Sequence, residues 1–408
     1  MVRIQRPARP IAKAETAFAR TKKEWASLAV LWLTGISLRL TILAVPPLLP
    51  DIHRTLGLSE ELVGALSGLP VLLLALGSVP GAFVISRLGA RRCLLLGLSM
   101  TCIAGAARGV LSSTLVLFSM TFVMAMGIAI SQPALPSLVR SWFSGHSGFA
   151  TAVYSNGFLI GEIVAAALTV PLVLPLAGGS WERAFAVWSV PIVVTVTGLA
   201  VLRPEEGVQL TDGPGRWWPD WRSGRTWRLG LIFGCGSIAY FGSNAFLPDY
   251  LKATHHSALI APALASLNIC QLPSSVLVAA MPGRLIGRRW AVATAGAAIL
   301  VSTAGFAAVE PLIVVWSGLL GFSSAMVFVL SLALPPLLAN TGDVPRLSAA
   351  MFTLSYALAA VGSLLGGVVW DATRVPLTAF APIFAAAILM MALSAGLRVE
   401  SRKVEVRS

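Results

Sequence analysis

Charged side chains are scarce in this sequence. Only 12% of its 408 residues are Asp, Glu, Lys or Arg, whereas 56% are hydrophobic and the mean hydropathy is +0.82. A water-soluble domain of this size could not cover its surface with so few charges. Apolar stretches of about 20 residues, the length that crosses a bilayer core of roughly 30 Å, recur along most of the chain. The composition therefore predicts an all-α integral membrane protein.

The sequence also lacks the motifs of nucleotide-dependent and metal-dependent enzymes. It has no GxxxxGK[ST] phosphate loop, no HExxH pair and no polar segment long enough to house ATP hydrolysis. Its four cysteines have neither metal-ligand nor disulfide spacing, and its four histidines fall in loops or at span ends. We therefore expect no cofactor, no metal and no enzymatic activity, and we expect a gradient to supply the energy.

Pro, Gly and charge clusters divide the apolar sequence into twelve expected helices. These spans are 25–49, 59–85, 93–110, 114–139, 147–174, 184–202, 227–250, 257–281, 290–309, 312–338, 347–370 and 377–397. The longest polar break separates six spans from six. We predict a basic N-terminus over 1–24, six-helix bundles over 25–202 and 227–397, a cytoplasmic linker over 203–226 and a tail over 398–408.

The net charge of +13 does not require a nucleic-acid partner, because the positions of the basic residues follow the positive-inside rule. With both termini inside, all but six of the 30 Lys and Arg residues fall in the termini or the inner loops. The exceptions are Arg39, Arg54, Arg108, Arg183, Lys252 and Arg374. We predict a multi-pass protein of the bacterial cytoplasmic (inner) membrane, monomeric, with both termini cytoplasmic.

Three short motifs occur twice, in the same order and at a nearly constant separation. The pairs are LPD at 49–51 and 247–249, SRLGARR at 86–92 with GRLIGRR at 283–289, and LP at 135–136 and 334–335. Two repeated six-span halves are typical of transporters whose halves move about a site near the bilayer midplane. The repeat favours alternating access over the two alternatives from other classes, an intramembrane enzyme and a non-transporting receptor.

Further motifs extend from the first span to the sixth. Residues 38–98 contain LeuArg, ProLeuLeuPro, LeuSer, GlyLeuPro and an ArgLeuGly, ArgArg loop, and LeuProSerLeu and GlyGlySerTrpGluArg follow later. In these features the chain resembles the cyanate and nitroimidazole transporter family of the major facilitator superfamily. The resemblance implies two pseudo-symmetric six-helix bundles, a small-molecule substrate and no cofactor.

The chain departs from the usual superfamily pattern at three places. Ser86 stands where the inner-loop motif usually has an acidic residue, so a charge latch between the halves must be built differently. Val123 and Met126 occupy the stretch of span four in which many proton-coupled members carry an arginine, which argues against proton coupling. Glu162 replaces the proline that drug antiporters have in span five, which argues against drug efflux.

Arg39 and Glu162 are the charges expected inside spans, at similar depths in spans one and five. An ionised group there costs about 2.5 to 3.5 kcal/mol or more, so it needs a partner or a wet cavity. Arg39 is predicted to bind a small planar anion through its fork of donors. The alternative is a structural ion pair with Glu162. Glu162 is a candidate proton acceptor, a counter-ion to Arg39, or a packing residue at an aqueous path.

Polar side chains at mid-depth form a second group of substrate-binding candidates, for which interhelical hydrogen bonds are the structural alternative. They are Tyr240, Asn244, Asn268, Gln271, Asn156, Gln132 and Tyr356. Arg108, near the outer end of span three, is expected to extend to the interface. Two clusters in the inner loops are candidates for gating, or for binding helix C-termini or anionic lipid: Arg87, Arg91, Arg92, Arg284, Arg288 and Arg289.

Together these features predict a secondary transporter of a small polar or anionic solute, such as cyanate or a planar organic anion. We expect import by alternating access, by uniport or with a coupling ion, a proton being the candidate. The alternative is proton-coupled efflux of an amphipathic drug or metabolite.

Overall fold

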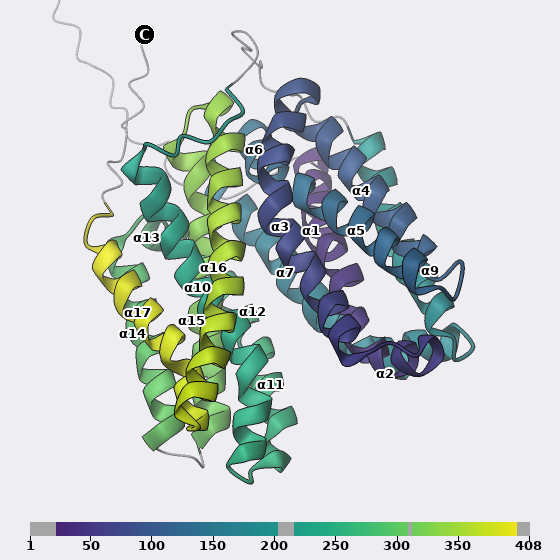
Figure 1. Ribbon diagram of the computed structural model, residues 1–408. Coiled ribbons are helices and arrows are strands. Elements are labelled where there is room, and N and C mark those ends of the chain that lie inside the picture. Colours follow the sequence, from purple (N-terminus) through teal and green to yellow (C-terminus); the bar gives the residue numbers. More distant parts are fainter. Residues whose placement is uncertain (1–21, 203–215, 309–311, 398–408) are drawn as a thin grey trace, which may run out of the picture.

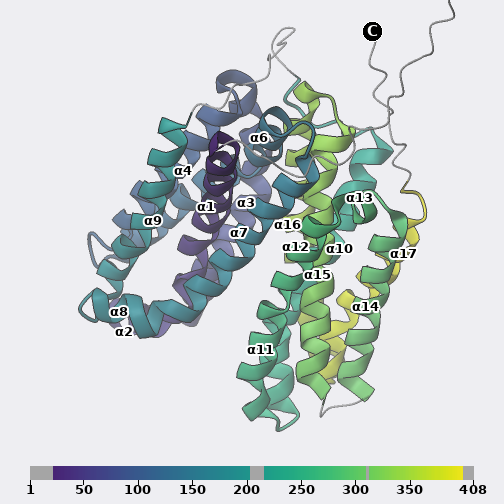
Figure 2. The same ribbon diagram turned by 180° about the vertical axis from the view of Figure 1, so that it is seen from behind.

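The computed structural model describes residues 22–202, 216–308 and 312–397 (Figures 1 and 2). Every regular element in these ranges is helical, and twelve helical segments are long and apolar enough to cross a membrane. The predicted fold class is therefore confirmed. The expected tail, most of the basic N-terminus and much of the linker lie outside the described residues.

The first six spans fold into one bundle, and several of them consist of more than one helix. Its elements are α1 (Lys22–Leu43), α2 (Val45–Leu56), α3 (Glu60–Leu88), α4 (Ala90–Ala107), α5 (Thr114–Ser131), α6 (Ala134–Trp142), α7 (Ser147–Leu168), the π-helix η1 (Thr169–Val173), α8 (Leu174–Leu176) and α9 (Trp181–Val201).

The last six spans form the other bundle. Its elements are α10 (Gly224–Ala253), the 3-10 helix η2 (Ser257–Leu259), α11 (Ile260–Ile269), α12 (Gln271–Ala280), α13 (Pro282–Leu285), α14 (Arg289–Ala308), α15 (Ile313–Leu338), η4 (Thr341–Asp343), α16 (Val344–Thr373), η5 (Pro376–Phe380) and α17 (Ala381–Ser394).

Prolines explain the main difference between the expected and the observed spans. The first span was expected to end at residue 49, but the chain breaks at Ala44 and continues as α2, which lies across one end of the bundle (Figure 1). Pro46 and Pro47 in the first turn of α2 have no N–H to continue the hydrogen bonding of α1. Span four breaks in the same way at Pro133, between α5 and α6.

The two bundles lie side by side and approach each other unequally along their length. They are close at the end where α1 begins and α17 ends, which we call the terminal end, and they diverge at the opposite end (Figures 1 and 2). Near the terminal end, α6 contacts α15 and α16, and α13 contacts α7. Arg140 on α6 donates from Nη1 to the carbonyl oxygen of Pro336 on α15 at 2.7 Å. The bundles are therefore joined at the terminal end.

Candidate functional site

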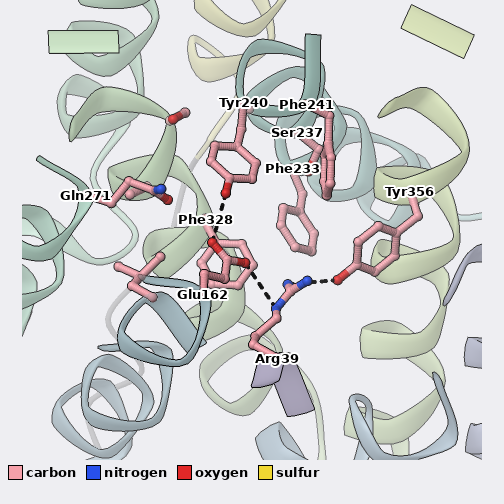
Figure 3. A pocket seen from close by; sticks show the side chains of 13 residues that line it. Arg39, Glu162, Phe233, Ser237, Tyr240, Phe241, Gln271, Phe328 and Tyr356 are labelled. Carbon is pink, nitrogen blue, oxygen red and sulfur yellow. Dashed lines mark hydrogen bonds and ion pairs between the residues drawn. The ribbon is translucent and has the colours of Figure 1, made fainter. Parts of the chain in front are cut away.

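A cavity lies between the two bundles, at about the middle of their length. Helices α1 and α7 line it from the first bundle, and α10, α12, α15 and α16 line it from the second. Its wall contains Arg39, Glu162, Tyr240, Gln271 and Tyr356, all of which the sequence singled out (Figure 3). The most informative residues of the sequence thus converge from five helices on one cavity.

Glycines bring α1 and α7 into backbone contact beside this cavity. A Cβ atom added at Gly161 would lie 2.6 Å from the carbonyl oxygen of Ile36, and one at Gly157 would overlap the carbonyl of Trp32. Gly35 on α1 has the same relation to the carbonyl of Tyr154. Small residues at a helix crossing allow such close approach in membranes. This crossing sets the separation of Arg39 on α1 and Glu162 on α7.

Arg39 and Glu162 are in contact, and both side chains are almost entirely buried. Arg39 Nε lies 3.2 Å from Glu162 Oε1, with the side chains 6% and 8% exposed. The Nε–H group does not have hydrogen-bond geometry toward that oxygen, so the contact is ionic rather than a directed bond. The guanidinium donates from Nη2 to the hydroxyl of Tyr356 at 3.2 Å, and its carbon lies 5.1 Å from the ring centre of Phe158.

On the other side of the cavity, Tyr240 joins Glu162 to a cluster of amides. The Tyr240 hydroxyl oxygen lies 2.9 Å from Glu162 Oε2 and 3.0 Å from Asn268 Oδ1 (Figure 3 shows the contact with Glu162). Gln271 Nε2 donates to Asn268 Oδ1, and Asn268 Nδ2 donates to Asn244 Oδ1. Four predicted side chains of the second bundle therefore form one network that reaches the acid of the first. We call Asn244, Asn268 and Gln271 the amide cluster.

Aromatic rings make up much of the remaining wall, and they were not among the residues predicted from the sequence. Phe233, Phe241 and Phe328 line the cavity beside the charged pair. Phe328 meets both Phe158 and Phe233 at ring-centre distances of 5.9 and 5.7 Å. A phenylalanine in an apolar span has no signal that separates a cavity wall from a lipid-facing position. The arrangement suits a flat solute that places a polar edge at Arg39 and a face against these rings.

Four predicted residues do not line the cavity: Asn244 and Asn268, which belong to the amide cluster behind Tyr240, and Asn156 and Gln132. Asn156 accepts from Trp32 Nε1 at 3.0 Å and donates to Ser275 Oγ at 2.9 Å, and it thereby ties α7 to α1 and α12. Gln132 is fully buried at the break between α5 and α6. Asn156 thus corresponds to the structural alternative, an interhelical hydrogen bond.

The position of Arg108 differs from the prediction. It was expected to extend to the interface, but its side chain is fully buried. Nη2 donates to the carbonyl oxygen of Thr41 at 3.0 Å, and the guanidinium lies 3.9 Å from the ring centre of Phe185. Thr41 lies near the C-terminus of α1, where carbonyl groups lack helical partners, so a buried donor is useful there. Arg108 therefore stabilises the end of the helix that carries Arg39.

The predicted gating arginines all lie toward the terminal end. Arg91 Nη2 contacts the carbonyl oxygens of Leu199, Ala200 and Leu202, at the C-terminus of α9, which agrees with the expected binding of a helix end. Arg87, in the last turn of α3, lies over the ring of Phe83 on the same helix. Of the other members, Arg92 lies at the start of α4, Arg284 in α13 and Arg289 at the start of α14, and Arg288 immediately precedes α14.

Ser86, at the position where an acid was missing, bonds to the carbonyl of Phe83 in its own helix. At the terminal end, Arg140 donates a hydrogen bond from the first bundle to the second, and its position gave no sign of this role in the sequence. In the described part of the chain, no three His, Cys, Asp or Glu side chains come together as a metal site would require.

The family and the named relatives of this chain are consistent with a cavity between two helical bundles. A family model described as the Major Facilitator Superfamily matches residues 31–283. The chain is 28% identical over 376 residues to the Bacillus subtilis (strain 168) "Uncharacterized transporter YycB", covering 90% of this chain and 93% of that one. It is 28% identical over 349 residues to the 2-nitroimidazole transporter of Escherichia coli (strain K12), covering 85% and 88%. It is 25% identical over 260 residues to the cyanate transport protein CynX of Escherichia coli (strain K12), covering 62% and 66%.

Solved structures share the fold at lower sequence identity. The human organic anion transporter MFSD10 (TETRAN) superposes with a TM-score of 0.76 at 16% identity, covering 92% of this chain and all of that one. Escherichia coli FucP in the outward conformation superposes with a TM-score of 0.70 at 12% identity, covering 93% of this chain and all of that one.

Proposed function

The chain belongs to the major facilitator superfamily, and on this premise we propose that it moves a small planar polar or anionic solute across the cytoplasmic membrane by alternating access, with Arg39 as the solute-binding charge. Its family and its named relatives are transporters rather than enzymes. The observation that carries the proposal is a buried guanidinium, in a cavity between the bundles, whose donors are mostly unused by the protein.

The hydrogen-bond count at Arg39 supports this role. A guanidinium has five N–H donors, and Tyr356 is the one acceptor that it bonds among the described residues. A purely structural arginine in a membrane would satisfy more of them, because unsatisfied donors are costly when buried. The remaining donors suit the oxygen or nitrogen atoms of a planar solute.

The relatives support the same class of solute. One is named for 2-nitroimidazole, which is flat and carries a nitro group, and another for cyanate, a small anion. Both have acceptor atoms for a guanidinium, and the flat ring also suits the phenylalanine wall. The same wall keeps the second candidate function open, proton-coupled efflux of an amphipathic compound, because aromatic surface binds such molecules with little specificity.

The arrangement of the bundles supports import. They meet at the terminal end, where Arg140 bonds Pro336, and diverge at the opposite end. With the termini cytoplasmic, as the distribution of Lys and Arg predicts, the diverging end faces outward. A similar fold has been solved in a form described as outward. An empty importer in this form is ready to receive an external solute.

Uptake of radiolabelled cyanate and of 2-nitroimidazole into proteoliposomes tests the proposal. We expect Arg39→Gln to lower cyanate uptake about 10- to 100-fold at equal protein incorporation, since a hydrogen bond to a charged group contributes about 1.5 to 3 kcal/mol. Arg39→Lys should restore little, because an ammonium lacks the planar fork. The matched control is Arg54→Gln, which changes an exposed arginine paired with Asp51. Wild-type uptake by Arg39→Gln would rule out the proposed role.

A further inference from the structure

We propose that the cavity binds an anionic solute together with one proton held by Glu162, and that the single O–H of Tyr240 transmits the protonation state of Glu162 to the amide cluster of the second bundle. This inference rests on the proposed function of Arg39. It adds the charge balance of the site and assigns a coupling role to Tyr240.

The charge of the cavity couples the binding of an anion to the binding of a proton. Among the described residues that line it, Arg39 and Glu162 alone carry formal charges, and they lie 3.2 Å apart. With both ionised, the cavity has no net charge, and an incoming anion meets a carboxylate on the guanidinium it would bind. With Glu162 protonated, the guanidinium is left without a counter-ion and attracts an anion. Binding of the anion and binding of the proton therefore favour each other.

The number of hydrogens available around Tyr240 also favours a protonated Glu162. Its hydroxyl has one proton but two oxygen neighbours, Glu162 Oε2 at 2.9 Å and Asn268 Oδ1 at 3.0 Å. If Glu162 is a carboxylate, Tyr240 can donate its hydrogen to only one of these two oxygens. The other oxygen then lies against the hydroxyl oxygen with no hydrogen between them. If Glu162 is protonated, it donates to Tyr240, and Tyr240 donates to Asn268. In the row Glu162–Tyr240–Asn268, which we call the line, every close pair of oxygens is therefore joined by a hydrogen bond when Glu162 is protonated.

Three other hydrogen bonds fix the orientation of the Asn268 amide. Its Nδ2 donates to the carbonyl of Leu264 at 2.9 Å and to Asn244 Oδ1 at 3.3 Å, whereas its Oδ1 accepts from Gln271 Nε2 at 3.2 Å. Turning the amide over to offer Tyr240 a donor would break all three bonds. Asn268 is thus held as an acceptor toward Tyr240, and the proton must come from the side of Glu162.

The position of this line between the bundles explains how a proton could influence their movement. Glu162 and Arg39 belong to α7 and α1, whereas Tyr240 and the amide cluster belong to the second bundle. The titratable or charged groups that face Glu162 are Arg39 and Tyr240, and Tyr356 on α16 reaches it through Arg39. The neighbouring wall from α12 and α15 contributes only uncharged side chains, namely Gln271, Ser324, Ala325 and Phe328. Protonation of Glu162 therefore changes a bond that joins the two bundles.

Proton uptake during cyanate binding tests the inference directly. Purified full-length protein in detergent and weak buffer receives cyanate, and a pH indicator and equilibrium dialysis report protons and cyanate bound. We expect about one proton taken up per cyanate, and an affinity that falls about tenfold for each unit of rising pH where Glu162 is ionised. Glu162→Gln, which mimics the protonated acid, should bind cyanate without proton uptake and with an affinity that no longer depends on pH.

Two further variants complete the test. Glu182→Gln is the matched control, because this acid on α9 bonds Ser112 and Ser180 and is not part of the cavity wall. It should retain proton uptake. In proteoliposomes, an imposed pH gradient should no longer drive cyanate accumulation by Tyr240→Phe, so the ratio of its uptake with the gradient to its uptake without the gradient should fall toward one.

The results separate this inference from the proposed function. Cyanate binding by the wild type without proton uptake, or unchanged proton uptake in Glu162→Gln, would overturn it. If cyanate uptake also depends on Arg39 in that case, the binding role of Arg39 stands alone. Gradient-driven accumulation by Tyr240→Phe equal to that of the wild type would overturn the assignment of Tyr240.

Discussion

Gly161 allows a direct test of how the two charges of the cavity are held together. An alanine methyl at this position would lie 2.6 Å from the backbone carbonyl oxygen of Ile36, and a helix backbone cannot rotate away as a side chain can. Ordinary van der Waals contact requires α7 to move away from α1 by about 0.8 Å. The Arg39–Glu162 distance would then increase from 3.2 Å to about 4 Å, the outer limit of an ion pair.

The energetic cost follows from this displacement. Overpacking of a tight contact costs about 1 to 3 kcal/mol. A glycine-to-alanine change in an unobstructed helix position instead contributes about 0.5 to 1 kcal/mol of stability, because alanine restricts the unfolded chain. Gly68 on α3 is such a position, since nothing lies within 4 Å of its added Cβ. The two substitutions are chemically identical and should have effects of opposite sign.

Thermal unfolding of the purified variants in detergent provides the assay. We expect Gly161→Ala to lower the unfolding midpoint and Gly68→Ala to leave it unchanged or raise it. In a Glu162→Gln background, Gly161→Ala should cost less, because the ionic contact it weakens is already absent. A Gly161→Ala protein as stable as Gly68→Ala would refute the idea that backbone contact between α1 and α7 sets the spacing of the pair.

Two other arginines support predictions of their own. Arg108→Lys should lower the unfolding midpoint, with a cost of about 1 to 3 kcal/mol, because an ammonium cannot both bond the Thr41 carbonyl and lie flat on Phe185; wild-type stability would contradict this. Arg140→Ala should increase the population with separated terminal ends, measured as longer distances between spin labels on Ser141 and Leu337, and an unchanged distance distribution would show that the bond to Pro336 does not hold the bundles together.

Hydropathy predicted the spans well because lipid offers no hydrogen bonds, so each crossing segment must be an apolar helix. The segment expected at 59–85 is α3, Glu60–Leu88, and the segment expected at 312–338 is α15, Ile313–Leu338. Helix breaks inside spans were harder to predict, because a proline in a membrane helix is often tolerated. The break at Ala44, before Pro46 and Pro47, depends on packing of α2 across the end of the bundle, which local sequence does not specify.

The charged centre of the site could be found from the sequence because burial of an ion is expensive. That cost identifies Arg39 and Glu162, but it does not say how an ion is satisfied. Arg108 bears the same cost, and its Nε and Nη2 bond backbone carbonyls; its place near the end of its span wrongly predicted that it would extend to the interface.

Uncharged polar residues were more ambiguous still. Many buried hydroxyls bond a carbonyl of their own helix, as Thr34 does with Val30 and Ser131 with Gly127. Such bonds remove any need for a partner elsewhere, so a polar residue in a span does not by itself mark a site. Asn156 and Gln271 differ in role only because one meets a neighbouring helix and the other meets the cavity.

The location of both formal charges of the cavity wall on the first bundle has an electrical consequence. Arg39 and Glu162 travel together as a fixed dipole when that bundle tilts, so reorientation of the empty carrier transfers little charge through the membrane field. The voltage dependence of each turnover is then set by the cargo. An anion accompanied by its proton contributes no net charge, whereas an anion carried alone would make transport work against a negative interior potential.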